Sequence, residues 1–263
     1  MSSFDIQGNS GAKILFKDDS QVYKYCTEPC IFERILEQGN FMKQYAEYGC
    51  FPIVHTIEKN GYTMDILNDI QYSEFTPDIF SRMKYILQKG IWFDTDINFS
   101  DGWKLALQDY YVGLVNKIFD EPIKKEVILE GLYAYLGFMD SDLMTKCEIH
   151  GDPTLDNCMR SPFNDDLRII DPIPYSYKIP PFKAVDLGKM LQSAYGYEGY
   201  IHNISKEQWI NREESIETIF ADESTPDILG ANFFLRLHLL RLIPYQPEKN
   251  KEYFKGLLYE LCV

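Results

Sequence analysis

Short apolar runs separated by turn residues predict β-strands in the first 67 residues. Asp18-Asp19-Ser20 is typical turn chemistry between two of these runs, and Asn60-Gly61 is a strong two-residue turn signal between two others. Pro29 suits the first turn of a helix. The expected elements are strands at 13–16, 22–25, 51–57 and 62–67 and a helix at 30–48.

From about residue 68 the apolar positions recur at the spacing of amphipathic helices. Leu107, Tyr111, Leu114 and Ile118, for example, lie three or four residues apart. We expect helices at 77–87, 101–119, 124–139, 184–193, 206–220 and 228–242. No linker or internal repeat separates the two halves, so the pattern predicts two lobes of one α+β unit.

Composition narrows the classes of function. The 263 residues are 45% hydrophobic and 15% aromatic, which is typical of a globular protein. A net charge of −14 without a basic run argues against a nucleic-acid partner. No apolar stretch is long enough for a transmembrane segment, and the six cysteines form no zinc pattern. Reduced thiols of this kind are typical of a cytoplasmic protein.

The most informative stretch is His150-Gly151-Asp152-Pro153-Thr154-Leu155-Asp156-Asn157, followed by Asp171 at the end of the apolar run 167–170. Phosphoryl transfer needs a carboxylate that orients the acceptor hydroxyl. It also needs an amide and a second carboxylate that hold Mg²⁺ against the nucleotide phosphates. Asp152, Asn157 and Asp171 have the spacing of these three groups in a kinase catalytic loop.

The motif resembles the aminoglycoside phosphotransferase and choline kinase superfamily, because of the Gly in H-G-D and the Pro after the second aspartate. The resemblance implies a bilobal protein-kinase-like fold. A small β-rich N-lobe, residues 1–67, would bind the nucleotide, and a larger helical C-lobe, residues 68–263, would bind the acceptor. Within the superfamily, H-G-D-P-T-x-x-N, I-D-P and D-L-G-K-M-L-Q-S are similar to small kinases of bacterial capsule and lipopolysaccharide loci.

The resemblance also implies a role for each motif residue. Asp152 would be the catalytic base that orients the acceptor hydroxyl. Asn157 and Asp171 would bind Mg²⁺, for which Mn²⁺ is a substitute. His150 would brace the loop by hydrogen bonds rather than transfer protons, and Asp186 would support the loop from the start of the next helix.

Lys24 is expected to hold the ATP phosphates and to pair with a glutamate of the helix at 30–48. Glu33 and Glu37 lie one turn apart, and we favour Glu37. A solvent-facing strand lysine is the alternative. Gly8 and Gly11 lie in a turn whose N–H groups would cover phosphates, although a hairpin with no ligand explains them equally well.

The second hairpin would end in the hinge of the nucleotide site. Adenine would then bond the backbone carbonyl of Asp65 and the backbone N–H of Leu67. Only fourteen residues separate Asp171 from Asp186, which leaves little room for an activation segment and disfavours a protein substrate. The glycine turn also lacks a full G-x-G-x-x-G.

We therefore expect an ATP- and Mg²⁺-dependent kinase that phosphorylates a hydroxyl of a small molecule, such as a sugar or sugar conjugate of cell-surface polysaccharide. Aminoglycosides, choline and ethanolamine are alternative acceptors. A non-catalytic nucleotide-binding module is the alternative to an enzyme. The sequence leaves the oligomeric state and the choice between ATP and GTP open. Candidate acceptor-binding residues are Tyr175, Tyr177, Lys178, Tyr195, Tyr197, Glu198 and Tyr200.

Overall fold

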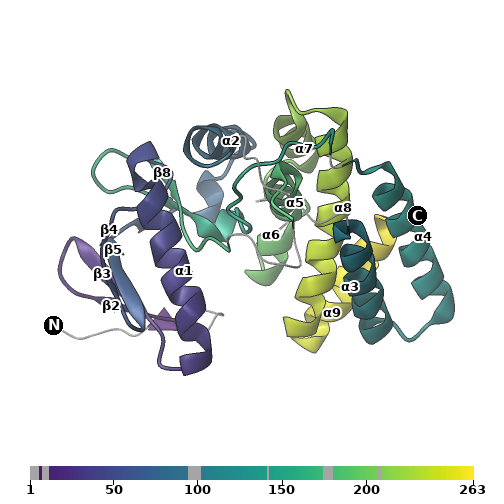
Figure 1. The fold of residues 1–263 in the computed structure, drawn as a ribbon, viewed down its shortest axis with the longest axis horizontal. Coiled ribbons are helices and arrows are strands. Elements are labelled where there is room, and N and C mark those ends of the chain that lie inside the picture. Colours follow the sequence, from purple (N-terminus) through teal and green to yellow (C-terminus); the bar gives the residue numbers. More distant parts are fainter. Residues whose placement is uncertain (1–5, 8–11, 94–101, 141, 174–179, 206–208) are drawn as a thin grey trace.

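A sheet with one long helix forms the N-terminal end of the molecule, and helices form the larger remainder (Figure 1). The computed structural model describes residues 6–7, 12–93, 102–140, 142–173, 180–205 and 209–263. The α+β prediction is confirmed. None of the helices in these ranges is long and apolar enough to cross a membrane.

The N-terminal sheet has five antiparallel strands in the order β1-β2-β3-β5-β4. The α1 helix connects β3 to β4 and packs against β4 and β5. The turn before β3 forms as expected, because the Asp18 carboxylate accepts hydrogen bonds from the N–H groups of Ser20 and Gln21 at 2.7 and 2.9 Å. The elements are β1 (Ile6–Gln7), β2 (Lys13–Phe16), β3 (Gln21–Tyr25), α1 (Pro29–Tyr45), β4 (Val54–Glu58) and β5 (Gly61–Asp65).

A second, three-stranded sheet links the two parts of the molecule. Its strands are β6 (Asn68–Asp69), β7 (Cys158–Arg160) and β8 (Leu167–Ile169), in that order and antiparallel. The chain that leaves β5 therefore pairs at once with the strand that follows the H-G-D motif. Short 3-10 turns occur at Ala46–Tyr48, Tyr72–Glu74, Leu155–Asn157 and Ile243–Tyr245.

Apart from these strands and 3-10 turns, the elements described in the larger part are helices. They are α2 (Asp78–Gly90), α3 (Trp103–Ile118), α4 (Pro122–Phe138), α5 (Lys183–Ala194), α6 (Tyr197–Ile201), α7 (Arg212–Phe220), α8 (Thr225–Leu242) and α9 (Glu248–Glu260). The helix expected at 228–242 begins three residues earlier, at Thr225, because the Ser224 side chain accepts from the Asp227 N–H and caps it.

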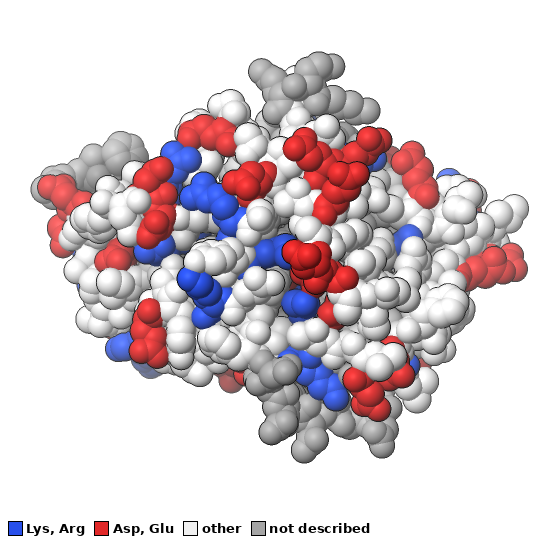
Figure 2. All heavy atoms as spheres, turned by 90° about the horizontal axis from the view of Figure 1, so that it is seen from above, with Lys and Arg blue, Asp and Glu red and all other residues white. Residues whose placement is uncertain are grey.

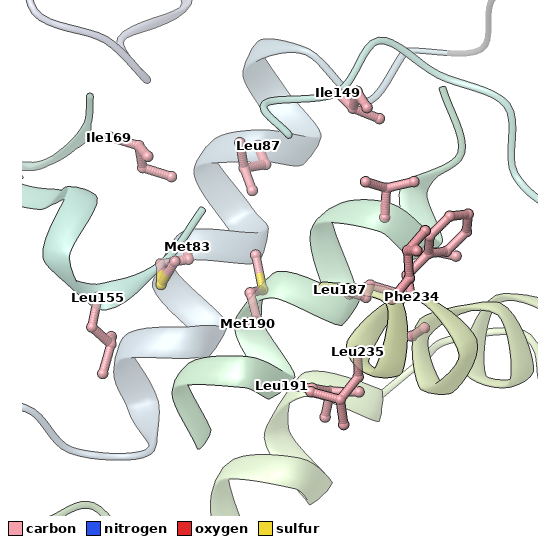
Figure 3. Packing of buried hydrophobic residues seen from close by; sticks show 14 of the residues in the cluster. Met83, Leu87, Ile149, Leu155, Ile169, Leu187, Met190, Leu191, Phe234 and Leu235 are labelled. Carbon is pink, nitrogen blue, oxygen red and sulfur yellow. The ribbon is translucent and has the colours of Figure 1, made fainter. Parts of the chain in front are cut away.

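The core of the larger part is centred on α5 and α8. Figure 3 shows apolar side chains of both helices close to those of α2 and of the segments that carry the motif. Gly188 allows the close approach, because a Cβ there would lie 2.8 Å from the Phe234 Cβ and 3.0 Å from the Ala231 carbonyl oxygen. Gly188, the glycine of the D-L-G-K motif, therefore allows α5 to pack closely against α8.

Candidate functional site

The H-G-D loop, residues 149–157, takes a shape that only glycine allows at its second motif position. Gly151 has a φ of +80°, which favours glycine, and a Cβ there would lie 1.9 Å from the Ile173 carbonyl oxygen. The chain after β8 therefore runs directly against the loop, and any side chain at position 151 would push the two segments apart.

Backbone hydrogen bonds fix Asp171 beside this loop. The Ile170 N–H donates to the Asn157 carbonyl at 2.9 Å, and the Ile173 N–H donates to the His150 carbonyl at 2.6 Å. Asp171 lies between these bonds and has a φ of +59°, in the left-handed region that few residues other than glycine, Asn and Asp adopt. The turn at the end of β8 is therefore tied to both ends of the motif.

Asp186 holds the loop from α5. Its carboxylate accepts hydrogen bonds from the N–H groups of His150 at 2.9 Å and Gly151 at 2.7 Å, and from the Trp92 indole at 2.9 Å. The side chain is fully buried, and this burial raises its pKa to about 6 against the lowering effect of its three donors. Asp186 thus has the contacts that a supporting role needs.

His150 is buried and its ring stacks on Phe51, with centroids 5.9 Å apart and an interplanar angle of 18°. Its Nδ1 accepts from the Asp152 N–H at 3.2 Å. Burial lowers the pKa of His150 to about 4, so the ring is neutral at physiological pH. These contacts suit a structural brace rather than a proton carrier.

Asn157 and Lys189 engage both oxygens of the Asp152 carboxylate. The Asn157 amide nitrogen donates to Asp152 Oδ2 at 3.1 Å and to the Asp152 carbonyl at 2.8 Å. Lys189 Nζ lies 2.9 Å from Asp152 Oδ1. Burial acts to raise the pKa of Asp152, but the charge and hydrogen bond of Lys189 outweigh it and the pKa is lowered. Sequence reasoning gave Lys189 no role.

Lys24 lies on β3 and contacts the Asp171 carboxylate. Its side chain is almost fully buried, at 3% exposed. Its second partner is Gln38, at 3.4 Å from Nζ to Oε1, instead of the expected Glu37. Glu33 and Glu37 are exposed. Gln38 lies on the buried face of α1 with Ile35 and Met42, whereas position 37 is turned away from it.

The expected hinge residues lie where β5 leaves the sheet. Asp65 is the last residue of β5, and its carboxylate accepts from the Ile53 N–H at 3.3 Å and lies 2.8 Å from His55 Nε2. The next residue, Ile66, donates its N–H to the Ser20 carbonyl at 2.8 Å. Leu67 then precedes β6. Gly8 and Gly11 lie outside the described residues.

The chemistry of Asn157 and Asp171 fits Mg²⁺. The Asn157 amide nitrogen points to Asp152, which leaves its Oδ1 for a cation, and Asp171 adds a carboxylate. One or two protein oxygens together with substrate phosphates are the usual set for this ion. Within the described ranges no three His, Cys, Asp or Glu side chains form a cluster that could bind a metal by protein ligands alone.

Aromatic and acidic groups gather around Leu155 and Asp156, near the end of the H-G-D loop. Asp156 accepts from the Tyr72 hydroxyl at 2.6 Å and lies 3.1 Å from His202 Nε2, beside a cavity of about 250 Å³. Glu198 is fully buried and accepts from the Ser193 hydroxyl at 2.5 Å and from the Leu155 N–H at 3.1 Å. Burial raises the pKa of Glu198 to about 8.

Of the tyrosines expected to line the acceptor site, three lie within the described residues, and each of these contacts another side chain. Tyr200 stacks on Tyr253 with centroids 3.8 Å apart, and Tyr197 packs on Phe254 at 5.8 Å, so both are engaged with α9. The Tyr195 ring lies under the Arg212 guanidinium at 4.9 Å. The remaining candidates, Tyr175, Tyr177 and Lys178, lie outside the described residues.

A separate cavity of about 580 Å³ lies between α2 and the turn before β8. Arg82, Lys89 and Arg168 are among the residues that line it. Figure 2 shows Lys and Arg side chains gathered near the middle of the face seen from above. The described lining includes no residue of the H-G-D loop, so this cavity is distinct from the motif cluster.

The sequence matches no protein-family model and no curated protein. Solved structures match it along nearly its whole length. A choline kinase from Streptococcus pneumoniae is 11% identical, with a TM-score of 0.59, over 100% of this chain and 93% of that one. The aminoglycoside phosphotransferase APH(4)-Ia, in a ternary complex with AMP-PNP and hygromycin B, is 8% identical, with a TM-score of 0.64, over 99% and 93%.

ADP-bound APH(2'')-Ib, another aminoglycoside phosphotransferase, is 13% identical, with a TM-score of 0.58, over 99% and 93% of the two chains. Likeness at these identities establishes the fold.

Proposed function

We propose, for a chain that has the protein-kinase-like fold of aminoglycoside phosphotransferases and choline kinases, that it is an ATP- and Mg²⁺-dependent phosphotransferase acting on a hydroxyl of a small molecule. One observation carries the proposal: Lys24 from the N-terminal sheet meets Asp171, and Asp171 is tied by backbone bonds to the loop of Asp152 and Asn157. All four groups that the reaction requires are present in one contact network.

In this proposal Asp152 orients the acceptor hydroxyl and takes its proton as the new O–P bond forms. Its lowered pKa keeps it a carboxylate, and its bonds to Asn157 and Lys189 fix its direction. Mg–ATP, when bound, supplies the phosphoryl group and an ion that offsets its charge. Asn157 and Asp171 would hold the ion, and Lys24 would bind the phosphates.

We further propose that the acceptor is a sugar or sugar conjugate of cell-surface polysaccharide, which the H-G-D-P-T-x-x-N and D-L-G-K-M-L-Q-S motifs support. The cluster of Asp156, Tyr72 and His202 offers hydrogen-bonding groups and ring faces that suit a sugar. The same cluster also suits an aminoglycoside or choline, so these remain the alternatives. ATP use and the free cysteines support a cytoplasmic location.

The test is mass spectrometry of sugars, aminoglycosides, choline and ethanolamine after incubation with the protein and Mg–ATP. We expect one acceptor class to gain a phosphate. Asp152→Asn should lower turnover at least 100-fold, because a positioned base contributes roughly 10²–10⁴, and it should still bind nucleotide. Full activity of this variant would contradict the role of Asp152. Nucleotide binding without transfer to any acceptor would favour a non-catalytic module.

A further inference from the structure

Lys189 reaches the H-G-D loop from α5. Its Nζ lies 2.9 Å from Asp152 Oδ1, and its side chain is 15% exposed. The same ammonium group donates to Gln192 Oε1 at 3.3 Å. An ammonium group has three donors, so these two contacts leave one for a further acceptor.

The position of Lys189 is fixed by its neighbours on α5. Asp186, one turn earlier, binds two N–H groups of the H-G-D loop. Leu187, Met190 and Leu191 are buried in the core (Figure 3). The helix segment that carries Lys189 is therefore anchored both to the loop and to the core. A charge held in this way needs little rearrangement when a reaction occurs.

The two carboxylates of the site each face one lysine. Lys24 contacts Asp171 and Lys189 contacts Asp152. Among the described residues no other Lys or Arg makes an ion pair with either carboxylate. Lys24 lies on β3 of the N-terminal sheet, and Lys189 lies on α5 of the larger part. The Lys189 ammonium group is therefore the described cation nearest to the residue that orients the acceptor hydroxyl.

We infer that Lys189 is a catalytic residue that binds the terminal phosphoryl group of the nucleotide during transfer. This inference rests on the proposed function. The bond between the terminal phosphorus and the leaving nucleoside diphosphate oxygen breaks, and a bond from phosphorus to the acceptor oxygen forms. The acceptor proton goes to Asp152. Lys189 stays protonated and stabilises the charge on the oxygens of the moving group.

A purely structural Lys189 would only hold α5 to the loop through its contact with Asp152. The two roles differ in one measurable respect. A lysine that contacts the terminal phosphoryl group distinguishes a nucleoside triphosphate from a diphosphate, whereas a structural lysine has the same effect on both. Binding of Mg–AMP-PNP and of Mg–ADP therefore separates the roles without an acceptor.

The experiment is calorimetric titration of the wild type, Lys189→Met and Lys189→Arg with each nucleotide. Lys255→Met is the matched control, because Lys255 pairs with Glu252 on the surface of α9. We expect Lys189→Met to weaken AMP-PNP binding by roughly tenfold or more, as for the loss of a charge-assisted hydrogen bond. ADP has no terminal phosphoryl group to make this bond, so its binding should change less than about twofold. Lys189→Arg should restore much of the AMP-PNP affinity.

Equal weakening of both nucleotides by Lys189→Met, or no weakening of either, would overturn the inference. A wild type that binds neither nucleotide would overturn the proposed function and this inference with it. Once an acceptor is known, Lys189→Met should lower kcat and leave the KM of the acceptor near the wild-type value. A change confined to the KM of the acceptor would assign Lys189 to acceptor binding instead.

Discussion

At the scale of single residues, buried carboxylates support the H-G-D loop by accepting hydrogen bonds from its backbone. Asp186 binds the N–H groups of His150 and Gly151, and Glu198 binds the N–H of Leu155. Both side chains are fully buried, and burial raises the pKa of both. The loop that carries Asp152, the proposed base, is thus held by two acids whose pKa values differ.

Glu198 predicts a loss of stability as the pH rises. Its folded pKa is about 8 and its ordinary value is 4.5, so the folded state holds a proton that the unfolded state has released. By linkage, its contribution is fully present below pH 4.5 and is lost as the pH rises to about 8. Between pH 6 and pH 8 the loss should be about 2 kcal/mol, because the full slope of about 1.4 kcal/mol per unit decreases as the pH reaches the folded pKa.

Urea unfolding at pH 6 and pH 8 measures this loss. Glu198→Gln should show a smaller decline than the wild type, because an amide does not titrate. Glu130→Gln, at an exposed position on α4, should decline as the wild type does. If Glu198→Gln and the wild type declined in parallel, Glu198 would not be the titrating group.

The sequence pointed to the motif residues and to Lys24 and Asp186 beside them, but not to Gln38 or Lys189. Asp152, Asn157 and Asp171 could be chosen because a reaction demands these groups at this spacing. Gln38 was missed because the search was for an acid, although the buried face of α1, with Ile35 and Met42, predicts position 38. Lys189 was missed because only the packing of α5 brings it to the loop.

At the scale of elements, the contact of α5 with α8 sets where Asp186 and Lys189 lie. The two helices approach closely at Gly188, where an added Cβ would lie 2.8 Å from the Phe234 Cβ. Local signals predicted α5 well, because its apolar face is continuous. They did not predict β7 or α9, since a three-residue strand depends on tertiary contacts and the terminal helix buries only Asn250, Phe254, Leu257 and Leu258.

Gly188→Ala should destabilise the protein by roughly 1–3 kcal/mol, because the added methyl overpacks a close helix contact. Gly256→Ala is the matched control, since a Cβ at position 256 on α9 meets no atom within 4 Å. The control should be neutral or stabilising by about 0.5–1 kcal/mol, the usual effect in a helix interior. Urea unfolding measures the free energy of unfolding of both variants. Equal changes in the two would contradict the close approach of α5 and α8.

At the scale of the whole molecule, the N-terminal part meets the larger part at the candidate site. The Ile169 N–H donates to the Cys50 carbonyl at 2.9 Å, and the Phe51 ring stacks on His150. Lys24 and Asp171 form an ion pair across the same junction. A ligand that binds there contacts both parts and should therefore stabilise the molecule as a unit.

Mg–AMP-PNP at a hundredfold excess over its Kd should stabilise the wild type by about 2.7 kcal/mol. Asp171→Asn removes a charge from the proposed metal site and should abolish most of the Mg²⁺-dependent part of this gain. Asp142→Asn, at a highly exposed position, should keep the gain. Thermal unfolding with nucleotide, with and without Mg²⁺, gives the comparison, and an unchanged Mg²⁺ response in Asp171→Asn would rule out Asp171 as a ligand.

The Lys24–Asp171 pair also has a consequence for the order in which ligands bind. In the proposed site, free Mg²⁺ would have to displace the Lys24 ammonium group from Asp171, and free nucleotide would meet a lysine that is already paired with a carboxylate. With both present, Lys24 would bind the phosphates and Asp171 would hold the ion, so each ligand would favour the binding of the other. Metal and nucleotide should therefore bind with positive cooperativity, and thermodynamic reciprocity requires each to raise the affinity of the other by the same factor.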